Sequence, residues 1–282
     1  LPTDGNLPQL NMVNADGTYP DPATPLSKQT PIAISSILQG SAPTGIVFAI
    51  ENADGCDGTA ADKAILIKDA DELAYFARQV NAGGLMLECR KGGSIINRKD
   101  QDNSKKGFAG YYFKLTDDIT LNELWTPIGN YTNSFRGNFD GDGHTVEGLK
   151  VYATDGGSGD DVYAGLFGMV QCGTIQNLGV WLDGEGIVAS GTGYVYAGGI
   201  VGWIQTVDKG NTAAILNCYV DAKGKGMVKA TSTSNDAIAG GITGGVSGVF
   251  DGTISLTHCY ATANVDATES GTNSKSYAGG IT

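Results

Sequence analysis

The side chains best suited to catalysis or metal binding are few and lie far apart in the sequence. The chain has only two histidines, His144 and His258, and no His-x-x-x-His or Cys-x-x-Cys spacing. Zinc sites are built from three or four such ligands at short spacings. His258 precedes Cys259, but no third group that would orient the imidazole is evident, which disfavours a Cys–His nucleophile. We therefore expect no metal site, no cofactor and no catalytic residue of this kind.

The stretch around Asp140 and Asp142 resembles half of a calcium loop. Carboxylates two residues apart, with a glycine between them, can wrap a hard cation. The bidentate glutamate that would complete such a loop is missing. A tight Gly-rich turn without metal is therefore the expected structure.

Two carboxylate pairs, Asp160 with Asp161 and Asp183 with Glu185, could serve a carbohydrate-active enzyme. Glycoside hydrolysis requires two carboxyl groups roughly 5 to 9.5 Å apart across a groove. Both pairs lie in Gly-rich stretches, where solvated turns are the usual outcome. A polysaccharide lyase or glycoside hydrolase that uses these loop carboxylates is therefore the alternative function.

Aromatic residues form the other candidate surface. Tyr219 and Tyr260 occupy matching positions in two copies of a repeat, which predicts that they stack as an outward-facing ladder. Such a ladder stabilises a sheet, and an exposed aromatic row also serves recognition. Together with Trp181 and Trp203, these tyrosines are the ligand-binding residues that we expect. The expected partner is a glycan or a host surface protein.

These residues are spread over copies of one glycine-led phrase, which starts at Ala164, Ala197, Ala239 and Ala278, at intervals of 33, 42 and 39 residues. Short apolar runs separated by turn-forming residues follow each start, and this pattern is typical of strands. One copy cannot bury its own apolar face, whereas stacked copies can. With about three strands per copy, we expect an all-β, right-handed parallel β-helix, or solenoid. A β-propeller, which needs four strands per blade, is the competing fold.

The repeats resemble a known family. Ala-Gly-Gly-Ile-Val-Gly at 197–202, followed by Asn-Cys-Tyr-Val at 217–220, is similar to the GLUG motif of bacterial cell-surface proteins. Trp-Thr-Pro-Ile-Gly-Asn at 125–130 and the run at 135–149 resemble the lead-in that these repeats carry. The resemblance covers roughly residues 64–282.

The resemblance implies a shape and a location rather than an activity. Members are surface proteins, often adhesin-like, of Bacteroides-type bacteria, and repeats rather than a catalytic constellation define them. Related repeats accompany an immunoglobulin-cutting metalloprotease, whose zinc motif is absent here. The first copy departs from the pattern, because Leu166 and Phe167 replace Gly-Ile and Leu178 stands where the second copy has Cys218. The implied function is a non-enzymatic adhesion or ligand-binding module on an extracellular, outer-membrane surface.

The sequence before the repeats divides into two parts. Residues 1–60 are expected to be an extended or β-rich lead-in, either part of a preceding β-domain or a sheet edge. Residues 61–121 are expected to be a capping region that contains a polar surface loop at 92–107. The β-helix repeats are expected at 122–282.

A helix over about 69–82 is the main prediction for the capping region. Its apolar positions follow a helical spacing, at Leu73, Phe76, Ala77 and Val80. Asp69 and Glu72 are placed to cap its start, and Gly83-Gly84 to end it. The open end of a solenoid exposes apolar residues and free strand edges. We therefore expect this helix to cap the N-terminal end of the stack.

Composition limits the partners and the compartment. Thirty acidic residues against 18 basic ones give a net charge of −12, which argues against nucleic acid and anionic lipid. No apolar run approaches the roughly 20 residues of a membrane span, and no signal peptide opens the chain. A start at Leu1 without Met indicates a processed chain, so an anchor in a missing N-terminal segment is compatible with a surface location.

Five cysteines leave at least one unpaired. Cys218 and Cys259 occupy matching repeat positions, so we expect them to stack, pointing inward, as buried free thiols. Cys56 and Cys89 flank the predicted helix, and a disulfide between them, which would suit an extracellular compartment, stays open.

Overall fold

The structure is a computed structural model that describes residues 50–51, 55–84, 86–91, 94–99, 103–224, 226–248, 251–272 and 274–281. The chain divides into two units after Ile46, and every described residue belongs to the second, Val47–Thr282. Most of the expected lead-in at 1–60 therefore lies outside the described residues. The strand β1 (Ile50–Glu51) belongs to the part of it that is described.

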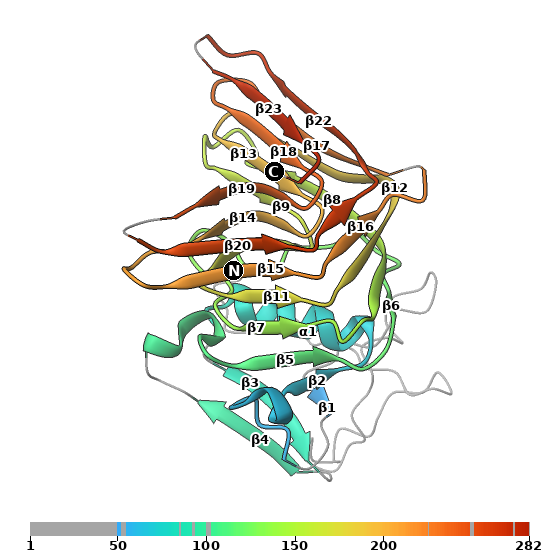
Figure 1. The fold of residues 1–282 in the computed structure, drawn as a ribbon, viewed down its shortest axis with the longest axis vertical. Coiled ribbons are helices and arrows are strands. Elements are labelled where there is room, and N and C mark those ends of the chain that lie inside the picture. The colour runs from blue at the N-terminus through green and yellow to red at the C-terminus, as the bar shows by residue number, and fades with distance from the viewer. Residues whose placement is uncertain are drawn as a thin grey trace, which may run out of the picture. The chain divides into compact units, whose positions relative to one another are not determined.

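The described unit is a parallel β-helix of about four turns, whose sides are four sheets that we number I to IV (Figure 1). Each full coil begins with a strand of sheet I and passes through sheets II, III and IV before it returns to sheet I. Coils 1 to 5 begin at β5, β7, β11, β15 and β20. The predicted fold class, a parallel β-helix with a helix near its N-terminal end, is confirmed.

Sheets I and II contain strands from every coil. Sheet I has, in spatial order, β2 (Ile65–Ile67), β5 (Tyr112–Leu115), β7 (Asn138–Asp140), β11 (Thr174–Gln176), β15 (Thr212–Leu216) and β20 (Thr253–Thr257). Sheet II has β6 (Ile119–Thr120), β8 (Thr145–Thr154), β12 (Gly179–Gly191), β16 (Tyr219–Asp221), β17 (Met227–Ser232), β21 (Tyr260–Ala261) and β22 (Asn264–Glu269). The long strand of sheet II is divided into two strands in coils 4 and 5. In coil 4, β16 and β17 both pair with β12, and in coil 5, β21 and β22 continue them.

Sheets III and IV start only in coil 2. Sheet III has β9 (Val162–Ala164), β13 (Val195–Gly198), β18 (Ala237–Gly240) and β23 (Ser276–Gly279). Sheet IV has β10 (Phe167–Gln171), β14 (Val201–Gln205) and β19 (Thr243–Ser247). Each glycine phrase spans the corner between these two sheets, so a full coil has four sides where about three strands were expected. Parallel pairing of successive copies is incompatible with propeller blades.

Close packing explains the glycines at this corner. Gly198 and Gly199 lie outside the positive-φ region. A Cβ on Gly198 would instead clash with the carbonyl oxygen of Val201, and one on Gly199 with the carbonyl oxygen of Gly241 in the next coil. The repeat needs glycine here because backbones approach too closely for any side chain.

The corner between sheets I and II is polar outside and apolar inside. Asn177, Asn217 and His258 share this position in successive coils and all have a positive φ, between 52° and 54°. His258 is therefore a corner residue. The next residue in each coil points inward. Cys218 is a buried free thiol, as predicted, whereas Cys259, one layer on, is a free thiol that is only half-buried.

The predicted helix is α1 (Ala70–Asn81), and Asp69 caps it by accepting a 2.9 Å hydrogen bond from the backbone N–H of Glu72. The Glu72 carboxylate accepts from the N–H of Lys68 at 3.0 Å, one residue before the position that a capping box requires. At the other end, the Asn81 side chain bonds Pro127 and Gly129 in coil 1. The helix therefore runs from the end of β2 to the far side of coil 1 and closes the stack.

Aromatic packing fixes this cap. Phe76 is fully buried, and its ring centroid lies 4.4 Å from that of Phe113, 5.7 Å from that of Phe135 and 6.0 Å from that of Phe139. Phe113 and Phe139 belong to β5 and β7, so one helical side chain joins two layers of sheet I. Burial of four rings in one cluster explains why a helix can replace a coil here.

The region between α1 and coil 1 differs from its prediction. Part of the expected loop at 92–107 is strand β4 (Ser94–Lys99), which pairs antiparallel with β3 (Met86–Lys91), and β3 also pairs with β1. The uninterrupted polar and charged run at 97–106 hid this hairpin, because it reads as a solvated loop. Two short 3₁₀ segments complete the capping region, η3 (Ala61–Lys63) before β2 and η4 (Asn103–Phe108) before β5. Cys56 carries a free thiol.

Candidate functional site

Coil 1 is shorter than the coils that follow, and this creates a cleft. From β6 the chain runs directly to Ile128, which bridges Phe167 at the start of sheet IV. Coil 2 covers the same arc with the second half of β8, a loop at 155–161 and all of β9. Within the described residues, coil 1 provides no strand beside β9, which is therefore the edge of sheet III.

The cleft has a volume of about 590 Å³. Its lining comes from 125–132 of coil 1 and from 152–163 of coil 2. The lining includes four aromatic side chains and three carboxylates, namely Trp125, Tyr131, Tyr152, Tyr163, Asp155, Asp160 and Asp161. Lysine, arginine and histidine are not among the described lining residues.

The aromatic side chains divide into a floor and a rim. The indole of Trp125 is buried and donates a 2.9 Å hydrogen bond to the carbonyl oxygen of Leu166. Tyr131 and Tyr152 are 75% and 64% exposed, so they form a rim that a ligand can reach. Between them, the half-buried Tyr163 stacks on Tyr196 of coil 3, with ring centroids 5.4 Å apart and planes at 10°. That stack covers the ring face turned toward coil 3, and the ring borders the cleft on its other side.

The carboxylates are held by the loops that carry them. Asp155 accepts hydrogen bonds from the backbone N–H and the hydroxyl of Thr192, both at 2.7 Å, and from the N–H of Gly157 at 2.8 Å. These donors hold the pKa of Asp155 well below its ordinary value. Glycines at 156, 157 and 159 have positive φ, which lets the loop turn its N–H groups toward this carboxylate.

Asp161 and the tyrosines influence each other. The Asp161 carboxylate accepts from the Tyr163 hydroxyl and from the backbone N–H of Tyr194, each at 3.1 Å. Burial and the nearby Asp161 charge raise the pKa of Tyr163, and the same causes raise the pKa of Tyr196 to about 12. Both phenols are therefore neutral hydroxyl groups at physiological pH. Asp160, on the outer side, accepts from the Ser158 hydroxyl at 2.7 Å.

The two carboxylate pairs that the sequence singled out lie in different surroundings. Asp160 and Asp161 line the cleft. Asp183 and Glu185 lie in the irregular middle of β12, where the register against β8 shifts. Asp183 pairs with Lys150 at 3.6 Å, and Glu185 accepts a 2.6 Å hydrogen bond from the Tyr152 hydroxyl. Glu185 thus supports the rim of the cleft through Tyr152.

The four predicted ligand-binding aromatics lie on two faces. Tyr219 and Tyr260 stack on sheet II with centroids 5.3 Å apart and planes at 6°, and Lys223 Nζ lies 3.3 Å above the ring centroid of Trp181 on the same sheet. Trp203 lies on sheet IV with its centroid 4.5 Å from that of Tyr196. It therefore belongs to the same aromatic group as Tyr163, beside the cleft.

Some residues of the cleft were missed. Tyr131, Tyr152 and Asp155 were not singled out, because the shortness of coil 1 was not recognised. Its signal was present, since the run at 125–130 resembles the start of a sheet IV strand but follows β6 with no room for a sheet III strand. Tyr163 and Tyr196 both precede Ala-Gly, so their stacking could have been read from the repeat.

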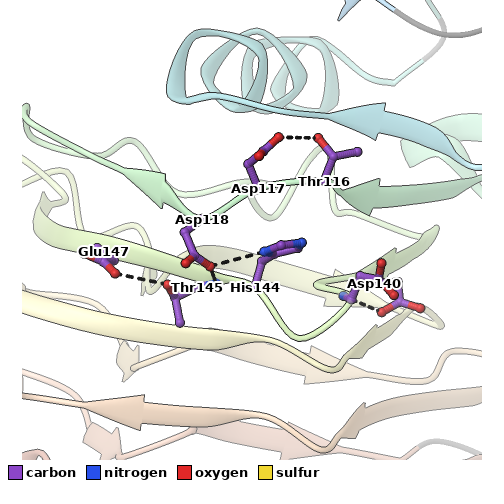
Figure 2. A network of polar contacts seen from close by, with 8 residues as sticks. Thr116, Asp117, Asp118, Asp140, His144, Thr145 and Glu147 are labelled. Atoms are coloured by element: carbon purple, nitrogen blue, oxygen red, sulfur yellow. Dashed lines mark hydrogen bonds and ion pairs between the residues drawn. The ribbon is translucent and has the colours of Figure 1, made fainter.

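A second polar cluster lies at the turn before β8 (Figure 2). Asp118 accepts from the backbone N–H of Thr145 at 2.8 Å and faces His144 Nδ1 at 3.3 Å, and the Thr145 bond is the main reason that the Asp118 pKa is lowered. Asp140 accepts from the side-chain amides of Gln176 and Asn177. The Asp-Gly-Asp turn is thus committed to bonds with the protein. Within the described residues, no three His, Cys, Asp or Glu side chains group closely enough to hold a metal ion.

Comparison with known proteins gives partial similarities. A relative from Evansella cellulosilytica, provisionally named a Gly-rich membrane protein, is 36% identical over an alignment of 90 residues that covers 29% of this chain. The matched part spans only about 10% of that relative's length. A provisionally named immunoglobulin A1 protease from Bacteroides ovatus aligns over 79% of this chain and 85% of its own, with 16% identity and a TM-score of 0.37.

The helices in the described part of the chain are too short or too polar to cross a lipid bilayer. No protein-family model matches the chain. The resemblance to GLUG repeats therefore stays a prediction from the residues quoted above.

Proposed function

We propose that this chain is a non-enzymatic, extracellular binding module that recognises carbohydrate through the cleft at the short coil. The observation that carries the proposal is the combination of exposed tyrosine rings and ionised or hydroxyl-bearing side chains around one 590 Å³ cavity. Binding sites for small ligands are concave, with apolar or aromatic walls and a few convergent polar groups.

The side chains of the cleft suit both the C–H faces and the hydroxyl groups of a sugar. Tyr131 and Tyr152 offer ring faces against which the C–H groups of a pyranose can pack, and aromatic rings contribute large contact areas. Asp160 and Asp161 accept hydrogen bonds from sugar hydroxyls, and bonds to a charged acceptor are stronger than neutral ones. The carboxylates also disfavour uronates and sialates, because like charges brought together without a cation are repelled.

A surface location supports this function. The chain is acidic, with a net charge of −12, and one relative is provisionally named a membrane protein. A rigid stack that holds a sugar-binding cleft is suited to adhesion, because the cleft needs no conformational change to bind. An acidic protein favours a neutral glycan or glycoprotein as its partner.

The proposal is tested by screening the chain on a glycan array and measuring the hits by calorimetry. The double variant Tyr131→Ala with Tyr152→Ala should lower affinity at least tenfold, because it removes both exposed rings of the rim. The double variant Tyr219→Ala with Tyr260→Ala on sheet II is the matched control, and it also tests the ligand-binding role expected for that ladder.

The outcomes separate the candidates. Loss of binding only in the sheet II variant would move the site to Trp181, Tyr219 and Tyr260. Release of new reducing or unsaturated sugar ends, abolished by Asp160→Asn with Asp161→Asn, would replace the binding module with the enzymatic alternative. No glycan bound at millimolar concentration would overturn the proposal.

A further inference from the structure

The floor of the cleft contains an open peptide edge. Val162 donates its backbone N–H to Tyr194 in coil 3, and β9 pairs with β13 in parallel register. In a parallel ladder, alternate residues direct both their N–H and C=O to the same neighbour. Val162 and Ala164 therefore face β13, and the N–H and C=O of Tyr163 face the opposite side, where coil 1 has no strand.

Two further observations place this peptide at the cleft floor. A Cβ built on Gly168 would lie 3.2 Å from both the Tyr163 carbonyl oxygen and Pro127 Cβ, so both groups border this glycine, and both residues line the cleft. Proline has no N–H to donate. Among the described residues, no hydrogen bond is made to the backbone N–H or C=O of Tyr163. Tyr163 is half-buried and lines the cleft, so its unpaired N–H and C=O are available to a ligand that displaces water from them.

The surroundings of that peptide are apolar. Trp125, Pro127 and Val162 line the cleft next to it, and Trp125 and Val162 are buried. A ligand group that fits must therefore offer a strong hydrogen-bond acceptor directly beside a small apolar group. A sugar hydroxyl offers the first only weakly and lacks the second.

We infer that the cleft selects sugars carrying an acetamido group, that is, N-acetylated hexosamines. The acetamido oxygen accepts from the Tyr163 N–H, its methyl group packs against Pro127 and Trp125, and a neighbouring sugar hydroxyl donates to the Tyr163 carbonyl. The rim tyrosines then hold the pyranose ring. This inference rests on the proposed carbohydrate-binding function and specifies its ligand.

An extended peptide is the other ligand that an open edge attracts. The edge here is a three-residue strand in which one residue faces outward, so it offers a single peptide group rather than a ladder. Exposed tyrosines and carboxylates complete the walls. This arrangement favours a sugar ring with a single acetamido group over an extended peptide with several amides.

Two matched sugar pairs test the inference on the full chain. N-acetylglucosamine is compared with glucose, and N-acetylgalactosamine with galactose, by calorimetry and by following the ¹⁵N-labelled Tyr163 amide. At least one acetylated sugar should bind about tenfold more tightly than the corresponding sugar without the acetamido group. One or two added hydrogen bonds are worth roughly that factor. The Tyr163 amide resonance should move with the acetylated sugar only.

A pair of variants isolates the N–H donor. Tyr163→Ala removes the ring and keeps the N–H, so the preference for the acetylated sugar should persist. Tyr163→Pro removes both, and proline is tolerated at an edge strand whose N–H faces away from the sheet, so the preference should disappear. If Tyr163→Pro does not fold, the amide resonance decides.

Each other outcome overturns the inference. Equal affinity for both sugars of each pair would overturn the acetamido preference and leave the carbohydrate-binding proposal intact. An array whose hits all lack acetamido groups would have the same consequence. Binding of N-acetylglycine N-methylamide as tightly as the acetylated sugars would point to a peptide site. Absence of any array hit would remove the proposed function as well.

Discussion

Coil 1 and coil 3 belong to the same stack but are stabilised differently. Coil 3 has a strand in each of the four sheets, and every one of these strands pairs with a strand of the next coil. Its glycines allow backbones to approach closely, and its Tyr196 ring stacks on the equivalent Tyr163 of coil 2. Coil 1 has two short strands and depends on the rings around Phe76.

The difference teaches where a solenoid can bind. In a regular coil, strand pairing uses the peptide groups and ring stacking covers the ring faces, so little is left for a ligand. Where coil 1 omits a sheet III strand, the next coil has a peptide edge and an aromatic ring without a neighbour on that side. Function is then located at the irregularity and the repeats hold it rigid.

The largest effect should follow from weakening the aromatic cap. Phe76→Ala should reduce the free energy of unfolding by about 3–5 kcal/mol, because it removes a fully buried ring that contacts four others. Urea denaturation followed by circular dichroism measures it. Phe76→Leu, which keeps most of the volume, should lose clearly less. A loss below about 1 kcal/mol for the alanine variant would mean that the helix does not hold the end of the stack.

In the regular coils, the sensitive positions should be glycines. Gly241→Ala should cost about 1–3 kcal/mol, because its Cβ would clash with the carbonyl oxygen of Gly280 in the next coil. Gly280 has the same place in the phrase but meets nothing within 4 Å, so Gly280→Ala should change stability by less than about 0.5 kcal/mol. Equal effects in chemical denaturation would show that the glycines are not needed for close stacking.

The sequence predicted the fold best where equivalent residues of successive copies have the same structural role. Ala-Gly-Gly at fixed places predicted the stack, and Cys218 with Cys259 predicted the inward layer, because equivalent residues in a solenoid meet one layer apart. The helix was predictable from Leu73, Phe76 and Val80, since its apolar stripe and its cap are local features. The expected number of strands per copy was one too low, because the phrase at 197–202 reads as a single apolar run although β13 ends and β14 begins within it.

The cleft was less predictable because it arises from the absence of a sheet III strand in coil 1 among the described residues. Nothing local distinguishes the run at 125–130 from a sheet IV strand in a complete coil. The one sign in the sequence is the short distance between β6, which ends at Thr120, and this run, which leaves no room for a sheet III strand. Asp155 was likewise invisible, since its partner Thr192 lies in the next coil and in a loop of another length.

Two ring stacks allow the comparison to be sharpened. Tyr219–Tyr260 and Tyr163–Tyr196 have nearly the same geometry, with centroids 5.3 and 5.4 Å apart. Double-mutant cycles to alanine should therefore give similar coupling energies, about 0.5–1.5 kcal/mol each. Only the second stack borders the cleft, so only Tyr163→Ala should also weaken sugar binding. Coupling in one stack and none in the other would show that ring geometry does not govern these contacts.

The smallest effect should come from Asp155, and it should depend on pH. This carboxylate joins the cleft loop of coil 2 to Thr192 of coil 3, and its pKa in the folded protein lies below its ordinary value of 3.8. A carboxyl group with a lowered pKa stabilises the fold above the unfolded value and loses this contribution as pH falls toward the folded one. Asp155→Asn should therefore melt below wild type at pH 7, and the gap should begin to narrow as the pH falls below about 3.8. Asp160→Asn, in the same loop but bonded only to Ser158, is the matched control and should leave the melting temperature unchanged. A gap for Asp155→Asn that stays constant from pH 7 to pH 3 would mean that the charge of Asp155 does not hold the wall of the cleft.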